Sequence, residues 1–479
     1  MMEQIISYIF KGYEIFILYF SSTYILVYLL LAIFSYAAIL KHIRFQKYLE
    51  ERTLFKSNHL MGVSVVAPAF NEGLNIVYNV HSLLSLTYPK FEVIIVNDGS
   101  TDDSLSKLIT EFDLVKVNFY YREEIPTAKV RGHYKSKNPI YAKLLVVDKE
   151  NRKSKADALN AGINSSKYPL FLCTDVDCIL KQDTILKLAK PFMEHNRRVI
   201  ATGAGIRISN SCEVKDGFLI KVHYPKEWLP RFQELEYVRA FLFGRMAWSK
   251  INGLLLVSGA LGMFDKEIAV KSGGYWHKSL GEDMELITRM RKYMYDSNQK
   301  FLIRYIPESL CWTEVPSTKT ILIRQRVRWA RGLIQTLYLH RKMFFNPHYE
   351  KTGFLILPYF FFFEFLVPIL EVTGILVILI SLVFNLLNIE NLLWMSLTVY
   401  LFYLLITFIS IAIDEILYKT YASASELIKL IGVAIIEPLV YHPLCLFAAL
   451  KGYWHFFNQK EQNWGVMTRK GFENPTTKK

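Results

Sequence analysis

The sequence predicts an α/β protein in which a doubly wound, mostly parallel sheet is combined with membrane-spanning α-helices. After residue 60, short and almost wholly apolar strand patterns alternate with helical patterns, as in a parallel sheet with helices on both faces. Apolar segments long enough to cross a bilayer lie on either side of that region, at 15–40, 353–388 and 392–413. The expected divisions are an amino-terminal anchor at 1–45, a cytoplasmic domain at 60–340, apolar helices at 350–452 and a basic tail at 453–479.

The composition indicates which kinds of partner this protein binds. The 479 residues carry a formal net charge of +14, and 52% of them are hydrophobic. This charge suits a protein that faces anionic lipid or handles anionic substrates. We expect no nucleic-acid partner, because the sequence has no recognition motif and its basic residues cluster near the apolar segments. The five cysteines are odd in number and match no zinc-site spacing, which indicates reduced thiols.

The amino-terminal segment is expected to be an uncleaved anchor. Residues 15–40 are almost free of charge, and no small-residue cleavage site follows them. Lys41, His42, Arg44 and Lys47 come directly after the apolar run. Basic residues at the end of a span favour the cytoplasmic side, so we expect the following domain to be cytoplasmic.

The alternation that predicts the sheet runs from residue 62 to residue 178. The expected elements are strands at 62–70, 91–100 and 169–178 and helices at 71–86, 101–112 and 155–166. Residues 119–150 interrupt this alternation, and their pattern predicts a hairpin excursion followed by a strand that rejoins the sheet. Ligands of such sheets bind at the carboxyl ends of the strands. Glu72, Asp98, Asp175 and Asp177 follow those ends.

The stretch TDVDC places two carboxylates, Asp175 and Asp177, two residues apart after a buried strand. Carboxylates this close repel each other unless a cation lies between them. Hard oxygen ligands with open positions suit Mg²⁺ or Mn²⁺ bound together with a diphosphate. Surface acids at this spacing are also common without a metal, and the position at a strand end favours the metal.

The stretch GEDMEL contains Glu282 and Asp283 at the start of a helical pattern. One interpretation is an acidic helix amino terminus that the helix dipole stabilises. The other is a general base that takes the proton of an acceptor hydroxyl in the transition state.

The stretch RQRVRWARG at 324–332 also has two interpretations. Positive charge beside an apolar span usually anchors the protein at the membrane. Alternatively, the planar guanidinium of Arg328 neutralises a leaving diphosphate, and Trp329 offers a flat face on which a sugar stacks. The acidic motifs earlier in the chain favour the second interpretation.

The carboxy-terminal apolar segments leave two topologies open. In the simpler one, 353–388 is one span bent at Pro368 and 392–413 returns to the cytoplasm. In that case 428–450 does not cross, because Glu437-Pro438 and His442-Pro443 break it into an interfacial or re-entrant piece. In the alternative, 353–388 splits into two short spans and 428–450 splits or crosses as well.

The motifs PAFNE, NDGS, KADALNAG, TDVDC, GED and QRVRW occur in this order in a membrane-anchored chain. This order resembles the family-two inverting glycosyltransferases, in particular the membrane group of cellulose, chitin, hyaluronan and poly-N-acetylglucosamine synthases. The resemblance covers roughly 60–335. It implies a nucleotide-sugar-binding fold of the GT-A type, a nucleotide-sugar donor and a Mg²⁺ or Mn²⁺ cofactor.

The resemblance also implies roles for residues at matching positions. Pro68, Asn71, Glu72 and Asp98 would line the uridine pocket, and Lys155 would approach the nucleotide or its diphosphate. Asp175 and Asp177 would bind the metal, and Asp283 would be the general base, with Glu282 as the other candidate. Gln325, Arg328 and Trp329 would hold the diphosphate and the acceptor end, beside the small-residue loop Ser258-Gly259-Ala260. Trp464 and Arg469 of the tail would close over the nucleotide.

The leading hypothesis is therefore a multi-pass plasma-membrane enzyme that transfers a sugar from a UDP-hexose or UDP-N-acetylhexosamine to a growing β-linked extracellular polysaccharide. A first alternative is a non-processive enzyme that adds one sugar to a lipid-linked acceptor. A second is a non-catalytic membrane export or binding component. The expected partners are the donor, a glycan or lipid-linked acceptor, the lipid bilayer and an accessory export subunit.

Overall fold

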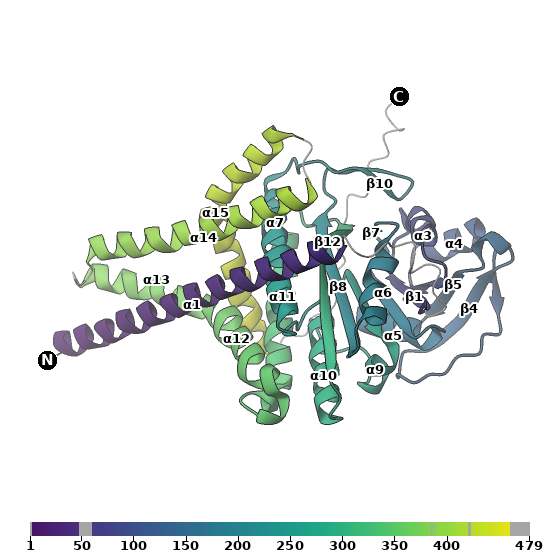
Figure 1. The fold of residues 1–479 in the computed structure, drawn as a ribbon, viewed down its shortest axis with the longest axis horizontal. Helices are drawn as coiled ribbons and strands as arrows, with labels where there is room; N and C mark the ends of the chain where they lie inside the picture. The colour runs from purple at the N-terminus through teal and green to yellow at the C-terminus, as the bar shows by residue number, and fades with distance from the viewer. Residues whose placement is uncertain (1, 47–59, 385, 387, 420–422, 460–479) are drawn as a thin grey trace.

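The structure is a computed structural model of the full chain. It describes residues 2–46, 60–384, 386, 388–419 and 423–459. A sheet domain occupies one part of the molecule, and long apolar helices extend from it (Figure 1). The expected combination of an α/β domain with apolar helices is confirmed.

The domain is built on a ten-stranded sheet with the order β3-β4-β5-β2-β1-β6-β11-β8-β12-β7. Its central strands β5, β2, β1 and β6 run parallel, and β8 and β12 are parallel to each other. The antiparallel strand β11 joins the two groups. The strands are β1 (Val63–Ala69), β2 (Phe91–Asn97), β3 (Leu114–Val117), β4 (Val130–Ser136), β5 (Leu144–Lys149), β6 (Leu170–Thr174), β7 (Ile179–Leu180), β8 (Arg198–Ile208), β11 (Leu261–Asp265) and β12 (Phe301–Thr313), with a separate hairpin of β9 (Glu213–Lys215) and β10 (Phe218–Lys221).

The central strands β2, β5 and β6 are buried over their whole length because helices cover both faces of the sheet (Figure 1). The three strands and three helices expected between 62 and 178 all form. The expected excursion is the antiparallel pair β3–β4, after which β5 rejoins the sheet beside β2. The helices of the domain are α3 (Ile76–Leu84), α4 (Ser104–Glu111), α5 (Lys155–Ser165), α6 (Thr184–Glu194), α7 (Trp228–Tyr237), α8 (Arg245–Lys250), α9 (Lys266–Lys271), α10 (Glu282–Asp296) and α11 (Lys319–Leu339).

Four helices are long and apolar enough to cross a membrane, judged by length and composition. They are α1 (Met2–Gln46), the run Thr352–Val383 that ends in α13 (Val367–Val383), α14 (Ile389–Tyr418) and α15 (Ala424–Phe457). The backbone bends at Leu366, just before α13 begins, which agrees with the bend expected at Pro368. Figure 1 shows α1, α13 and α14 extending away from the sheet together, while α15 runs obliquely across them.

The expectation that prolines break the segment 428–450 is wrong. Helix α15 is continuous and contains both Pro438 and Pro443. It packs along α11, where Gly452 faces the Ala330 side chain and the Val327 carbonyl, and this packing supports the helix on one side. Apolar helices tolerate proline when neighbouring elements hold the helix.

Buried ion pairs join the domain to the apolar helices. Arg207 of β8 contacts both Glu234 of α7 and Asp414 of α14. Both guanidinium nitrogens of Arg239 donate to the Glu437 carboxylate of α15, at 2.7 and 2.5 Å. These long-range pairs fix α14 and α15 to the domain. A third arginine, Arg326 of α11, pairs in the same way with Glu236 and with the Tyr441 hydroxyl of α15.

Candidate active site

Acidic side chains gather around one lysine at the carboxyl edge of the sheet. Lys155 is the first residue of α5, and its ammonium group forms an ion pair with Asp175, which follows β6. The same ammonium donates a hydrogen bond to the Gly259 carbonyl at 2.9 Å. The TDVDC turn and the small-residue loop before β11 therefore meet at Lys155.

The start of α10 reaches the same place. A Cβ atom built on Gly259 would lie 3.5 Å from Asp283 Oδ2, from Glu282 Oε1 and from Lys155 Nζ. A side chain at position 259 would therefore occupy the space that these three groups share. The preceding residue, Ser258, has a φ of 145°, an unfavourable angle for a residue with a side chain. Such strain is found preferentially at functional sites.

The two carboxylates of the GED turn differ in environment. Glu282 is 3% exposed, whereas Asp283 is partly exposed. Burial, together with the charge of Asp283, raises the pKa of Glu282, and the positive charges of Lys155 and Arg328 oppose this rise. The charges of Arg328 and Lys155 thus both act on Glu282. Asp283 is the carboxylate that a substrate reaches more easily.

The TDVDC turn provides a donor set for a cation. Ligand atoms of Asp175, Asp177 and Cys178 all lie within 4.8 Å of one another. Two carboxylates on one short turn fit Mg²⁺ or Mn²⁺, which prefer oxygen ligands. Asp177 is buried, so its carboxylate gains from a nearby positive charge.

The four residues expected around uridine lie at the carboxyl ends of β1 and β2, with Pro68 inside β1. Asn71 has a left-handed backbone, with φ of 56°, and its side-chain oxygen accepts a hydrogen bond from the Thr101 amide at 2.8 Å. Its side chain therefore joins the turn after β1 to the turn after β2. Pro68 and Glu72 are partly exposed beside it.

Asp98 is buried and has a partner that the sequence analysis missed. The Lys149 ammonium, which is completely buried, lies 2.6 Å from Asp98 and 2.8 Å from Asp157 of α5. Burial raises the pKa of Asp98 even though Lys149 opposes the rise. The ion pairs of Lys149 with Asp98 and Asp157 therefore connect the turn after β2 to α5, the helix that begins with Lys155. The near-continuous apolar pattern before Lys149 indicated only a strand and gave no sign of this contact.

Helix α11 carries the QRVRW stretch alongside the site. Gln325 is buried, and Trp329 is 38% exposed. The Arg326 guanidinium lies 4.1 Å from the Trp329 ring centroid and pairs with Glu236, so Arg326 supports the indole from the protein side. Gly332 packs against Gly281, directly before the GED helix, and a Cβ on Gly332 would lie 2.7 Å from the Gly281 nitrogen. The close contact of these two backbones brings α11 against the start of α10.

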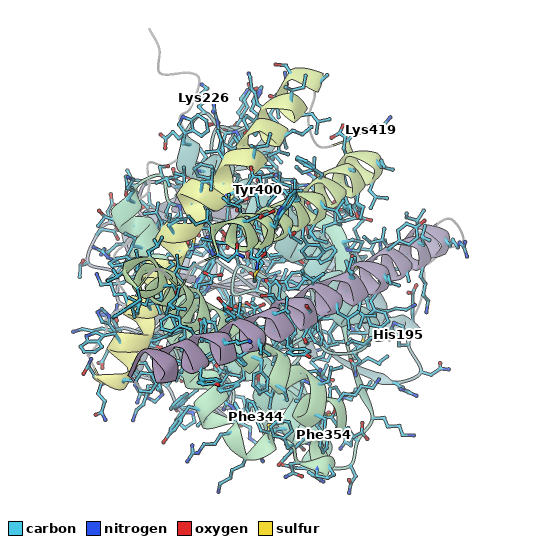
Figure 2. All side chains as sticks on the ribbon, turned by 90° about the vertical axis from the view of Figure 1, so that its left-hand side faces the viewer. His195, Lys226, Phe344, Phe354, Tyr400 and Lys419 are labelled. Atoms are coloured by element: carbon cyan, nitrogen blue, oxygen red, sulfur yellow. The ribbon has the colours of Figure 1, made fainter. Side chains whose placement is uncertain are left out.

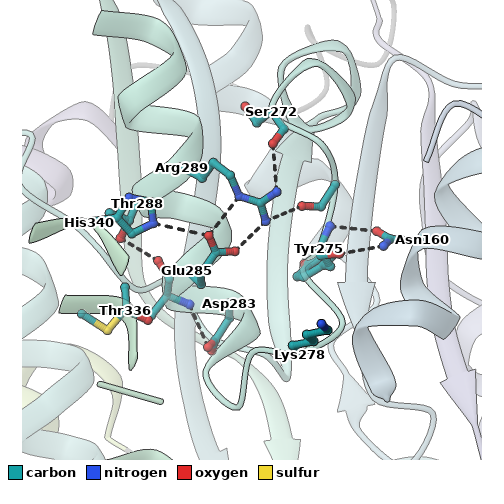
Figure 3. Close-up of polar contacts among 12 residues, drawn as sticks. Asn160, Ser272, Tyr275, Lys278, Asp283, Glu285, Thr288, Arg289, Thr336 and His340 are labelled. Atoms are coloured by element: carbon teal, nitrogen blue, oxygen red, sulfur yellow. Dashed lines mark hydrogen bonds and ion pairs between the residues drawn. The ribbon is translucent and has the colours of Figure 1, made fainter. Parts of the chain in front are cut away.

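Polar side chains that sequence reasoning missed hold the loop 272–281 that leads into Glu282. Arg289 donates to the carbonyls of Ser272 and Gly274, at 3.0 and 2.8 Å, and pairs with Glu285, whose carboxylate also contacts His340 (Figure 3). Asn160 of α5 forms hydrogen bonds to both the nitrogen and the carbonyl of Tyr275 (Figure 3).

The last part of this loop is held by α11. The Gln335 amide donates to the Lys278 carbonyl at 3.0 Å and accepts from the Leu280 nitrogen at 3.1 Å. The contacts from Arg289, Asn160 and Gln335 all go to backbone atoms of the loop. The position of Asp283 therefore depends on α5, α10 and α11 together.

The structure thus forms two groups from the expected site residues. Asp175, Gly259, Glu282 and Asp283 lie around the Lys155 ammonium, Asp177 lies beside Asp175, Ser258 precedes Gly259, and the charge of Arg328 acts on Glu282. Pro68, Asn71, Glu72 and Asp98 lie at the neighbouring strand ends. Trp464 and Arg469 lie outside the described residues. The described cysteines Cys173, Cys178, Cys212, Cys311 and Cys445 are free thiols, as expected.

Comparisons with known proteins identify the family. The family model described as "Glycosyltransferase like family 2" matches residues 61–332. The chain is 29% identical over 282 residues to the poly-beta-1,6-N-acetyl-D-glucosamine synthase of Staphylococcus epidermidis, covering 58% of this chain and 57% of that protein. It is 27% identical over 276 residues to the enzyme of the same name from Staphylococcus aureus strain COL, covering 57% and 55%. The chain thus matches little more than half the length of these curated relatives.

Solved structures with a similar arrangement were also found. The mannosyltransferase PcManGT from Pyrobaculum calidifontis, in complex with GDP-Man and Mn²⁺, has a TM-score of 0.48 and 16% identity, and the match covers 90% of this chain and 100% of that one. Residues 1–349 of S. aureus TarS in complex with UDP-GlcNAc have a TM-score of 0.35 and 14% identity, and the match covers 57% of this chain and 67% of that one.

Proposed function

The chain belongs to the glycosyltransferase-like family 2, and from this premise we propose that it is a membrane-bound inverting glycosyltransferase. Its donor is a UDP-hexose or UDP-N-acetylhexosamine, and its acceptor is a growing β-linked extracellular polysaccharide. The names of the curated relatives support UDP-N-acetylglucosamine as the first donor to test. The observation that carries the proposal is the meeting of Asp175, Glu282 and Asp283 around the Lys155 ammonium.

Asp283 is the general base of the proposed reaction. The acceptor hydroxyl oxygen forms a bond to the anomeric carbon while the bond to the diphosphate breaks on the opposite face, and Asp283 takes the hydroxyl proton. Asp283 suits this role better than Glu282 because Asp283 is partly exposed, so an acceptor can reach it, whereas Glu282 is buried.

Positive groups around the carboxylates hold the leaving diphosphate. Lys155 contacts Asp175, and Arg328 acts on Glu282. A planar guanidinium binds phosphate oxygens in pairs. Asp175 and Asp177 would hold Mg²⁺ or Mn²⁺, and a bound cation would neutralise part of the diphosphate charge. In this proposal Gln325, which is buried on the same helix as Arg328, contributes to donor binding.

The two ends of the site bind different parts of the substrates. Pro68, Asn71, Glu72 and Asp98 bind the nucleoside in this proposal, at the carboxyl ends of β1 and β2. Trp329, together with Ser258 and Gly259, faces the acceptor, because one face of its indole is supported by Arg326 and the ring is partly exposed. The closing role of Trp464 and Arg469 over the nucleotide stays a prediction.

The proposed location is the plasma membrane, with a cytoplasmic catalytic domain. The basic residues Lys41 and Arg44, which end the apolar run of α1, support this orientation. In this proposal α1, α13 and α14 cross the bilayer, and the continuous helix α15 is a further candidate span. An accessory export subunit completes the proposed set of partners.

Membranes that contain the full chain test this function directly. They would be incubated with a panel of labelled UDP-sugars, and the product would be sized. We expect one donor to yield polymer and excess chelator to abolish the product. Asp283→Asn membranes serve as the control for background transfer. A product carrying a single added sugar would overturn the polymer assignment, and absence of transfer from every donor would overturn the enzyme assignment.

A further inference from the structure

A group of cationic side chains lies at the end of α1, directly after its apolar segment. Lys41 is the first charged residue after the apolar segment 15–40, and its side chain is exposed. The last third of α1 packs on the domain, where Ile39 is buried and the Ser35 hydroxyl donates to the Leu242 carbonyl at 3.1 Å. Helix α8 lies against this part of α1. The end of α1 is therefore held at a fixed place on the domain.

Two arginines and a histidine come to this place from other elements. The Arg304 Nε–H of β12 donates to His195 Nε2 at 3.3 Å, and its terminal nitrogen donates to the Ser249 carbonyl of α8 at 3.2 Å. Arg197 stands two residues after His195, immediately before β8, and is exposed. Figure 2 views the molecule from the side of the apolar helices and shows His195 beside the carboxyl-terminal half of α1.

The charges in this group repel one another. Burial lowers the pKa of His195, and the charges of Arg304 and Lys41 lower it further. Burial likewise lowers the pKa of Arg304, with a contribution from Arg197. The hydrogen bond from Arg304 requires an unprotonated Nε2, which agrees with a neutral His195.

Nearby carboxylates do not balance these charges. Glu194 pairs with Lys190 at 3.7 Å, and Glu308 pairs with Lys187 and with His42. Within the part of the chain that the structure describes, no carboxylate lies within ion-pair distance of Lys41, Arg197 or Arg304. Arg207 and Arg239, in contrast, both contact acids.

We infer that Lys41, Arg197 and Arg304, with His195, form a binding site for the phosphate headgroup of an anionic phospholipid. Basic residues directly after an apolar run lie at headgroup depth when the helix is in a bilayer. Arginine and lysine both donate to phosphate oxygens. The inference depends on α1 lying in a bilayer and is independent of sugar transfer.

The apolar surface of α1 favours a lipid over a soluble phosphate. Leu30 and Ile33 are exposed, at 45% and 62%. Leu30 precedes Lys41 by eleven residues, which is about three helical turns, so both lie on the same face of α1. A molecule with a phosphate and acyl chains contacts both the cations and this face. A free phosphate contacts only the cations.

The test uses the purified full chain in detergent, incubated with phosphatidylglycerol or phosphatidylcholine, and measures the lipid retained by native mass spectrometry. We expect phosphatidylglycerol to be preferred, and Arg304→Gln to reduce that preference about fivefold, the effect of one cation near a membrane surface. Arg304→Lys keeps the charge and should retain most of the preference. Arg122→Gln is the matched control, because Arg122 is exposed and precedes β4 at the other edge of the sheet.

The outcomes separate the possible ligands. Loss of the preference in Arg304→Gln and in Arg197→Gln, but not in Arg122→Gln, supports the site. Equal preference in all variants would show that lipid binds elsewhere and would overturn the inference. Displacement of phosphatidylglycerol by millimolar inorganic phosphate would show that the acyl chains add nothing, and would overturn the assignment to a lipid.

Discussion

Two regions of this molecule differ in how their carboxylates are paired with cationic side chains. Where the domain meets α14 and α15, the arginines Arg207 and Arg239 contact carboxylates from other elements. At the carboxyl edge of the sheet, Asp175, Glu282 and Asp283 lie around Lys155, and Asp177 lies beside Asp175 on the same turn. We call the first region balanced, because each of these carboxylates pairs with an arginine of the chain, and the second unbalanced, because Lys155 and Arg328 act on a larger number of carboxylates.

The difference separates a structural role from a ligand-binding role. Balanced ion pairs in a buried place hold elements together, and removal of one partner leaves an uncompensated charge. An excess of one sign is unfavourable until a ligand of the opposite sign binds. At the carboxyl edge that ligand is a cation, brought with the diphosphate. Perturbed charge clusters of this kind are characteristic of active sites.

The largest effect expected at the unbalanced region comes from Asp283→Asn. The change keeps the shape of the side chain and removes its ability to take a proton, so turnover should fall by about two to four orders of magnitude. Affinity for UDP should stay close to that of the unchanged protein. The measurement is the initial rate in membranes, normalised to protein amount, beside a UDP-binding assay. Near-normal turnover would exclude Asp283 as the base and leave Glu282 as the candidate.

In the balanced region, we expect loss of one ion-pair partner to lower stability instead of turnover. Arg239→Met leaves Glu437 buried without its ion-pair partner and should lower the free energy of unfolding by about 3 kcal/mol. The double variant Arg239→Met/Glu437→Met removes both charges and should recover much of that loss. The readout is the thermal unfolding midpoint in detergent. Lys271→Met is the control: it breaks an exposed pair with Glu267, which should change stability by less than about 1 kcal/mol.

The comparison also shows what the sequence could predict. Asp98 and Asp175 follow strand ends, so local patterns alone predict that they lie at one edge of the sheet, whereas only the family resemblance predicted that Asp283 joins them. The contact of Lys149 with Asp98 and Asp157 was missed, because it joins three separate elements. Prediction of such a pair requires the register of the strands as well as their existence.

Local sequence patterns do not show contacts between separate elements, and this also explains why the predicted break in α15 was wrong. Pro438 and Pro443 are strong local signals for a break, and a local signal carries no information about the helix that packs beside them. Helix α11 and the Arg239–Glu437 pair hold α15 along its length. Tertiary contacts therefore overrode a local preference. The positions of Gln335 and Arg289 were missed for a related reason: both contact backbone atoms of a loop, and such contacts leave no sequence motif.

Helix α11 contains both kinds of arginine and allows a sharper test. Arg328 acts on Glu282 at the site, whereas Arg326 pairs with Glu236. Arg328→Lys loses the planar fork and should reduce transfer at least tenfold, about 1.4 kcal/mol of barrier, with expression unchanged. Trp329→Ala should have an effect of the same size and spare UDP binding. Arg326→Lys should instead lower the unfolding midpoint. Wild-type rates for Arg328→Lys and Trp329→Ala would mean that this stretch is only a membrane anchor.

The smallest expected effect concerns the link between the two regions. Gln335 lies on α11, which packs against α15, and it holds the loop before Asp283 by two hydrogen bonds to backbone atoms. A neutral hydrogen bond contributes about 1 kcal/mol, and only part of that positions the base, so Gln335→Ala should lower turnover about threefold. The KM for the donor should stay unchanged, because Gln335 contacts the loop and not the nucleotide side.

Gln335→Glu keeps the acceptor for the Leu280 amide and should retain more activity than Gln335→Ala. The exposed Gln299, at the far end of α10, provides the control Gln299→Ala, for which we expect no change. If Gln335→Ala lowers only the unfolding midpoint and leaves turnover at the control value, the loop is held by Arg289 and Asn160 alone and Gln335 has no positioning role.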